Sequence, residues 1–235
     1  MGGYGQFCPV ALGSEVVATR WTPLIVRELL QGSIRFSELQ RGLPRISRNL
    51  LVQRLATLEQ AGIIETRPRV AGRGREYRLT AAGEDLRPVI EALGVWGYKW
   101  AGQTLTPDCL DPGLLLWFIH RRVRMQHLPA ERHIVRFDLQ DARRRLYWLV
   151  LQPPDVDVCA IDPGFDVDLR VEATVEALTE VYLGRTTLRA ALRDERVRLV
   201  GRREACDAFP RWFGSSPFAP ATPLDAPHGR VADVS

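Results

Sequence analysis

The side chains with the clearest chemistry stand on one stretch of the chain, residues 44–62. Arginine, asparagine and glutamine pair bidentately with guanine or adenine edges in the major groove of DNA. No Asp or Glu lies between Arg48 and Leu58, whereas an ordinary surface helix mixes acids and bases. A solvated amphipathic helix is the alternative interpretation of this stretch alone. The residues predicted to contact DNA from it are Ser47, Arg48, Asn49, Gln53 and Arg54.

A helix must position these side chains, and the sequence predicts one. Ser47 is an expected N-cap, because its hydroxyl can accept a hydrogen bond from a free amide of the first turn. Gly62 is expected to end the helix at a position where a positive φ costs little. The apolar residues recur on one face, which predicts a buried stripe. These residues are Ile46, Leu50, Leu51, Leu55 and Leu58.

A hairpin is predicted directly after this helix, because the period of apolar residues changes from 3.6 to 2. Residues 63–67 and 76–79 are the two expected strands, and the loop between them is rich in Gly and Arg. A lone Arg-rich loop is often a solvated turn, but here it follows a candidate recognition helix. Arg69, Arg73 and Arg75 are therefore predicted to reach phosphates or a minor groove.

Helices are predicted on both sides of this unit. Residues 9–19 and 21–30 form the first two, and Ser37 is expected to cap a third over residues 38–41, so that a helix-turn-helix results. Thr80 is expected to cap a long helix over residues 81–102. Its apolar stripe is consistent with either a domain core or the seam of a dimer that reads two half-sites. The stripe consists of Leu86, Val89, Ile90, Leu93, Trp96, Gly97 and Trp100.

Charge is concentrated around the candidate recognition helix. The chain of 235 residues has a formal net charge of +4, and residues 35–78 alone hold 10 Arg against 4 Glu, a local charge of +6. A basic patch of this kind is typical of nucleic-acid-binding modules. No run of 18 apolar residues and no signal peptide is seen, which predicts a cytoplasmic protein without a membrane span.

Six motifs follow one another along residues 8–101. They are C-P-V from Cys8, R-W-T-P-L-I-V-R-E-L-L from Arg20, R-F-S-E-L from Arg35, I-S-R-N-L-L-V-Q-R-L-A-T-L-E-Q-A-G-I-I from Ile46, Y-R-L-T-A-A-G from Tyr77 and V-I-E-A-L-G-V-W from Val89. In these motifs the chain resembles the HxlR-type winged helix-turn-helix regulators. The resemblance implies a dimeric bacterial transcription regulator, whose recognition helix enters the major groove of double-stranded DNA and whose first and last helices form the homodimer.

The four cysteines, Cys8, Cys109, Cys159 and Cys206, are scattered, and no C-x-x-C pair suggests a zinc or thioredoxin-like site. Cys8 precedes Pro9 at an expected helix N-terminus, where the helix dipole would favour a reactive thiolate. Cys8 is therefore a candidate redox or electrophile sensor, and a small packing residue near a dimer seam is the alternative.

A second domain is predicted after a linker at residues 106–112. A helix over residues 113–125 precedes four period-2 runs, interpreted as an antiparallel meander. Two short helices, a fifth strand at 196–200 and a last helix over 202–213 follow. The expected fold class is therefore α+β: a winged helix-turn-helix domain at 1–105, and a five-stranded sheet packed with helices on one face at 113–213. Residues 214–235 are expected to form a flexible tail.

Residues 113–213 resemble the sterol carrier protein type-2-like fold, and the match is clearest from Gly201 through the aromatic last helix. The resemblance implies an apolar tunnel for a lipid-like effector. Filling of the core by the same residues is the alternative. The candidate lining residues are Trp117, Phe137, Trp148, Tyr182, Phe209 and Trp212, with Phe213 beside them.

Catalysis and metal binding are not predicted. The spacings of His120, His127 and His133 do not suit a metal site on a helix, and no cofactor motif or hydrolase motif occurs. Asp162, Asp166 and Asp168 could suggest carboxylate chemistry, but the alternation predicts that Asp166 and Asp168 lie on the solvent face of a strand. The remaining alternative function is a carrier of lipid or another apolar ligand, or a protein-interaction module, whose winged helix no longer reads DNA. A steep salt dependence of DNA affinity would argue against it.

Overall fold

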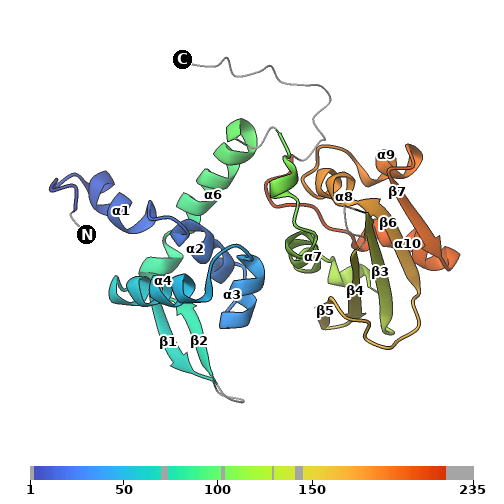
Figure 1. Cartoon of the computed structure of the whole chain (residues 1–235), viewed down its shortest axis with the longest axis horizontal. Coiled ribbons are helices and arrows are strands. Elements are labelled where there is room, and N and C mark those ends of the chain that lie inside the picture. Colours follow the sequence, from blue (N-terminus) through green and yellow to red (C-terminus); the bar gives the residue numbers. More distant parts are fainter. Residues whose placement is uncertain (1–2, 70–73, 102–103, 129, 141–144, 221–235) are drawn as a thin grey trace. The chain divides into compact units, whose positions relative to one another are not determined.

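The chain folds into two compact units, Met1–Gln103 and Thr104–Ser235, in a computed structural model (Figure 1). No helix in the described part of the chain is long and apolar enough to cross a membrane. The structure describes residues 3–69, 74–101, 104–128, 130–140 and 145–220.

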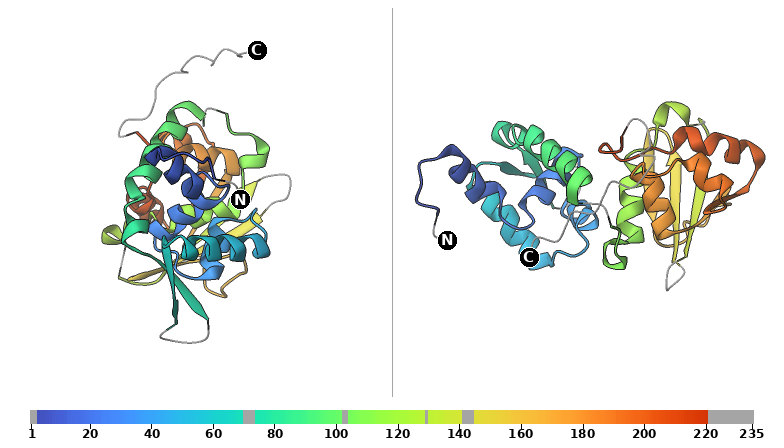
Figure 2. Two further views of the ribbon diagram at one scale, coloured as in Figure 1. Left: turned by 90° about the vertical axis from the view of Figure 1, so that its left-hand side faces the viewer. Right: turned by 90° about the horizontal axis from the view of Figure 1, so that it is seen from above.

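The first unit is a helix-turn-helix followed by a two-stranded antiparallel hairpin, in which Ile64 lies opposite Leu79. The hairpin extends away from the helices of the unit (Figures 1 and 2). This is the winged helix-turn-helix arrangement that the sequence predicts. Its elements are α1 (Pro9–Val17), α2 (Thr22–Leu30), α3 (Phe36–Gly42), α4 (Arg48–Gln60), β1 (Ile64–Pro68), β2 (Arg75–Leu79), α5 (Ala81–Glu84), α6 (Arg87–Trp96) and the π-helical turn η1 (Gly97–Ala101).

Helix α4 begins and ends as its sequence predicts. The Ser47 hydroxyl accepts a hydrogen bond from the Leu50 amide at 3.3 Å, and Gly62 follows the helix with a φ of +69°. Leu51, Leu55 and Leu58 are at most 2% exposed and face the core of the unit. The opposite face of α4 is consequently left to solvent.

Two helix boundaries in this unit differ from the prediction. Helix α3 is capped at Arg35 rather than at Ser37, because the Glu38 carboxylate accepts the amides of Ile34 and Arg35 at 3.0 and 2.9 Å. The single helix predicted over 81–102 is divided into α5 and α6. Pro88 lies in the first turn of α6 and has no amide to donate to the preceding turn, which explains the break.

The second unit is a five-stranded sheet with its helices packed on one face. The strand order is β5-β4-β3-β6-β7. Residues from one face of the sheet share a buried cluster with all four α-helices of the unit, as with Phe137 of β3 and Phe209 of α10. The elements are η2 (Pro107–Cys109), α7 (Pro112–His120), η3 (Met125–His127), β3 (His133–Gln140), β4 (Arg145–Gln152), β5 (Asp155–Cys159), β6 (Leu169–Thr174), α8 (Val175–Tyr182), α9 (Leu188–Arg193), β7 (Val197–Gly201) and α10 (Arg203–Trp212).

The predicted four-stranded antiparallel meander is wrong in its last step. Strands β3, β4 and β5 do pair in that way, but β6 lies on the other side of β3 and runs parallel to it, with Val135 opposite Leu169. The turn at Asp162–Gly164 therefore belongs to a connection that passes β4 and β3, not to a hairpin. A period-2 pattern reports which face a residue occupies, and it carries no information on which strands are neighbours.

Helix α7 ends at His120, five residues before the predicted end. The Arg122 amide donates to the Ile119 carbonyl at 2.9 Å in a tight turn, and the Arg124 amide donates to the Trp212 carbonyl of α10 at 3.0 Å. Arg121, Arg122 and Arg124 are thus outside the helix. The contact with α10 redirects the chain toward η3.

Candidate nucleic-acid interface

The exposed face of α4 presents Arg48, Asn49 and Gln53 together, all without acidic neighbours on the helix before Glu59. Ser47 is also exposed, and its hydroxyl is used as the cap. The Arg48 guanidinium lies over the ring of Phe36 at 4.9 Å, a cation–π contact that restricts its position at the start of the helix. This face can donate and accept hydrogen bonds at base edges in a major groove.

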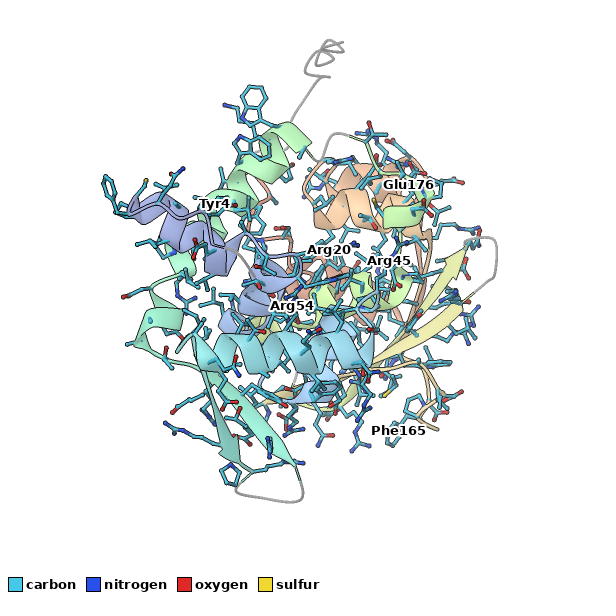
Figure 3. The ribbon with its side chains drawn as sticks, turned by 60° about the vertical axis from the view of Figure 1, so that its left-hand side comes forward. Tyr4, Arg20, Arg45, Arg54, Phe165 and Glu176 are labelled. Carbon is cyan, nitrogen blue, oxygen red and sulfur yellow. The ribbon has the colours of Figure 1, made fainter. Side chains whose placement is uncertain are left out.

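Arg54 stands apart from this face. It is half-buried, its Nε is buried without a hydrogen-bond partner in the described part of the chain, and it lies on the side of α4 that turns toward α2 (Figure 3). The guanidinium end could reach a phosphate at the margin of the helix. Direct contact with bases fits Arg48, Asn49 and Gln53 better than Arg54.

The wing contributes further basic residues. Arg75 is exposed at the start of β2. Arg69 is half-buried and follows β1, and its backbone amide donates a hydrogen bond to the Gly74 carbonyl at 3.2 Å, which extends the pairing of the two strands. Arg73 lies outside the described residues. Arg67 and Arg78 pair with Glu65 and Glu76 at 2.5 and 3.0 Å, so their charges are compensated within the hairpin.

The wing is held to the recognition helix by Glu59 near the end of α4. Its Oε1 accepts a hydrogen bond from the Thr66 amide of β1 at 3.1 Å. Glu59 and Thr66 also line an open hollow of about 420 Å³ at this junction. The hydrogen bond fixes how the hairpin leaves α4, so that helix and wing form one surface. The other lining residues are Arg67, Pro68, Gly74 and Arg75.

Helices α2 and α3 are joined beneath this surface by a buried carboxylate. Glu28 is fully buried and accepts hydrogen bonds from Arg27 at 2.9 Å and from the Ser33 hydroxyl at 3.2 Å. Arg27 also donates to the Gly42 carbonyl at the end of α3, at 3.2 Å. This network sets the position of the turn that leads into α4.

Some exposed residues on and beside the candidate interface were not included in the sequence prediction. Arg41 and Arg45 are exposed in and just before the turn that precedes α4, and both belong to the basic excess of residues 35–78. That charge count was the signal that could have identified them. Val52, exposed on α4, gave no signal of charge or hydrogen-bonding capacity.

Large apolar side chains are exposed on the first and last helices of this unit and just before the first. On α6 and η1 these residues are 48–59% exposed, and Phe7 before α1 is 97% exposed. Of the stripe predicted on the last helix, Ile90 is buried in the unit's own core. The exposed residues are Phe7, Val10, Leu12, Val89, Leu93, Val95, Trp96 and Trp100.

Cys8 occupies the N-cap position of α1 and is partly exposed. The backbone amides of Ala11 and Val10 lower the pKa of its thiol below the ordinary value. Burial, together with the charge of Asp207, raises the pKa of the Cys206 thiol in the second unit. The pKa is thus lowered for Cys8, as expected for a reactive cysteine, and raised for Cys206, as expected for an inert one.

The six residues predicted to line a cavity in the second unit are all buried, but they are not all together. Phe137, Tyr182, Phe209 and Trp212 belong to the core cluster on the helical face of the sheet. Trp148 pairs in register with Arg136, whose neighbours Val135 and Phe137 face the helices, so Trp148 lies on the opposite face. Trp117 lies outside the cluster and packs against His120 at 4.4 Å.

The predicted solvent-facing aspartates behave differently from one another. Asp166 is exposed, but Asp168 lies just before β6, accepts a hydrogen bond from the Ile134 amide at 2.8 Å and pairs with Arg202. Its role is to join β3, β6 and the start of α10. No group of three or more His, Cys, Asp or Glu side chains that could hold a metal ion is found among the residues that the structure describes.

The fold and the exposed face of α4 define the first unit as a winged helix-turn-helix module. The model of the HxlR-like helix-turn-helix family matches residues 16–105. The chain is similar to the HTH-type transcriptional regulator YvaP of Bacillus subtilis, with 36% identity over 113 residues, 45% of this chain and 96% of that one. It belongs to the HxlR-like helix-turn-helix family and is a transcriptional regulator of the helix-turn-helix type.

Further relatives are similar to less than half of the chain. An HTH-type transcriptional regulator of Methanothermobacter thermautotrophicus is 35% identical over 99 residues, 41% of this chain and 75% of that one. Among solved structures, the reduced form of the transcriptional regulator YodB from B. subtilis is 28% identical, with a TM-score of 0.37. The match covers 43% of this chain and 100% of the YodB chain.

Proposed function

We propose that the protein binds operator DNA as a homodimer, with α4 in the major groove and the wing on the flanking backbone. The observation that carries this proposal is the acid-free exposed face of α4, where Arg48, Asn49 and Gln53 stand beside a basic wing. Glu59 joins these two parts through its hydrogen bond to Thr66. Base-reading side chains and phosphate-binding side chains are thereby presented on one surface.

The test is a titration of the protein against the DNA upstream of its own gene, at two salt concentrations. Tight binding with a defined footprint and a steep loss of affinity with salt is expected, because several phosphates are neutralised. Arg48→Ala should weaken this binding. Weak binding without a footprint, on this DNA and on sequences selected from a random pool, would contradict the proposal.

Asn49→Ala is expected to weaken operator binding by roughly 1–3 kcal/mol and to blur base preference, if Asn49 pairs bidentately with adenine. Arg75→Ala in the wing is its matched comparison, and should weaken binding to all sequences about equally and reduce the salt slope. Affinities for the operator and for scrambled DNA measure both effects. An equal loss on the two DNAs from Asn49→Ala would exclude base reading by that residue.

Dimer formation through α1 and α6 is supported by their exposed apolar side chains. A soluble monomer rarely leaves a large contiguous apolar patch in water. In a dimer with two-fold symmetry, the two copies of α4 could contact two half-sites of one operator, one helical turn of DNA apart. The length of a footprint reports this directly.

The alternative is a carrier or interaction module whose winged helix does not read DNA. It would leave the acid-free face of α4 unexplained, since a solvated helix gains from mixing charges. Under this alternative, DNA binding would be weak and Arg48→Ala would have no effect on sequence preference. The titration therefore separates the two functions.

Cys8 is proposed as a sensor of oxidants or electrophiles, on the basis of its N-cap position and its lowered pKa. Because the pKa is lowered, the thiolate persists to lower pH than for an ordinary cysteine. Limited alkylation at pH 7 should therefore modify Cys8 well before Cys206, whose pKa is raised. Peptide mass spectrometry measures the order of modification. Release of DNA by a quinone should be lost in Cys8→Ser, and retention of that response would place the sensor elsewhere.

The second unit is proposed to bind an apolar effector carrying one hydrogen-bond acceptor. Its support is the resemblance of residues 113–213 to the sterol carrier protein type-2-like fold, together with Trp212. The Trp212 indole Nε1 is buried beside Phe209 and has no hydrogen-bond partner in the described part of the chain. An acceptor on a ligand could satisfy it. A shift in tryptophan fluorescence with fatty acids or sterols, absent in Trp212→Phe, would test this.

A further inference from the structure

Val52 is an apolar residue in the middle of the predicted DNA-reading face of α4. Its side chain is 53% exposed, whereas the core residues Leu51 and Leu55 are 0% and 2% exposed. Val52 therefore adds little to the core of the unit. Valine is also a poorer helix former than alanine, so helix propensity does not explain it either.

The neighbours of Val52 on the helix surface can approach bases. Arg48 and Asn49 precede it by four and three residues, which places their side chains beside it on the same face. Ala56 follows by four residues and is exposed, with the smallest side chain that a good helix former can have. The surface around Val52 is thus flanked by hydrogen-bonding groups on one side and open on the other.

The major groove offers one apolar group at base edges, the C5 methyl of thymine. We propose that Val52 determines specificity by packing against a thymine methyl in each half-site of the operator. Residues three apart on a helix have Cβ atoms about 5–6 Å apart, and base pairs rise by about 3.4 Å. The thymine should then lie within about two base pairs of the base that Asn49 contacts. This inference rests on the proposed DNA-binding function.

The experiment replaces each thymine of a selected operator with deoxyuridine, one at a time, which removes only the methyl group. Wild-type protein should lose about three- to fivefold in affinity at one thymine per half-site, as expected for exposing one methyl group. Val52→Ala should bind the unmodified operator more weakly by a similar factor and should show no further loss at that thymine. Val200→Ala, at a valine 43% exposed in the second unit, is the matched control and should behave as wild type.

The outcomes separate this proposal from the function on which it rests. If wild-type protein binds every deoxyuridine operator as tightly as the thymine operator, Val52 does not read a methyl group, although operator binding stands. The same conclusion follows if Val52→Ala retains the loss at that thymine. Failure of the wild type to select any sequence would overturn both. Circular dichroism of Val52→Ala should show unchanged helix content, which removes misfolding as a cause.

Discussion

Gly42→Ala is expected to lower the free energy of unfolding of the first unit by about 3 kcal/mol or more. Losses of this size are seen when a buried charged group is separated from its hydrogen-bonding partners. A Cβ added at Gly42 would lie 1.9 Å from Oε2 and 2.1 Å from Cδ of Glu28. Glu28 is fully buried, so its carboxylate cannot move aside into water. Moving it would also break the hydrogen bonds from Arg27 and Ser33, at 2.9 and 3.2 Å.

Gly13→Ala in α1 is the matched control, because no atom lies within 4 Å of its added Cβ. It should be neutral or slightly stabilising, since alanine is the better helix former. Urea unfolding followed by hydrogen exchange in peptides from α2 to α4 distinguishes the first unit from the second. Equal stability of Gly42→Ala and Gly13→Ala would mean that α3 can shift away from Glu28 without cost.

The same substitution should also reduce DNA binding at temperatures where the unit is still folded. Gly42 ends α3, and its carbonyl accepts a hydrogen bond from Arg27 at 3.2 Å. The turn that follows leads directly to Ser47 and α4. A displaced α3 would therefore shift α4, together with the wing that Glu59 holds to it, relative to the other helices of the unit. This shift would change the spacing of the two recognition helices in the proposed dimer.

Helix α4 could be predicted in detail because its determinants are local. The Ser47 cap, the buried leucines and the positive φ at Gly62 each depend on residues within a few positions along the chain. Such features follow from side-chain chemistry and helical spacing alone. The polar residues on the exposed face of the helix could be predicted for the same reason. Val52 was not predicted there, because an apolar side chain has neither charge nor hydrogen-bonding groups that would indicate contact with DNA.

The errors in the second unit arose where residues far apart in the sequence decide the structure. The cap of α3 is a different case, because two local caps compete: Glu38 accepts the amides three and four residues before it, and this arrangement prevails over a cap at Ser37. The position of β6 beside β3 depends on pairing between strands, and a period-2 pattern does not indicate which strands are neighbours in the sheet. The division of the aromatic residues between the two faces of the sheet followed from strand register, which placed Trp148 opposite Arg136.

Leu93→Glu is expected to convert the protein to a monomer and to reduce operator affinity by about 100-fold or more, because simultaneous contact with two half-sites is lost. Leu93 is 49% exposed on α6 and is flanked by Val89 and Trp96, which are 48% and 58% exposed. Two glutamates near the axis of a symmetric interface would also repel each other. The unit itself should remain folded, since glutamate is a good helix former and Leu93 is outside the buried core.

Ile161→Glu is the control for added charge, because Ile161 is 82% exposed in the second unit and lies on neither α1 nor α6. Light scattering should give a dimer for this variant and for the wild type, and a monomer for Leu93→Glu. Titration should show that the monomer still binds a single half-site weakly. The slope of its affinity against salt concentration should be about half that of the dimer, because about half as many phosphates are contacted. A Leu93→Glu protein that stays dimeric would move the interface to another surface. A monomer with unchanged operator affinity would show instead that a single copy of α4 and its wing is sufficient for recognition.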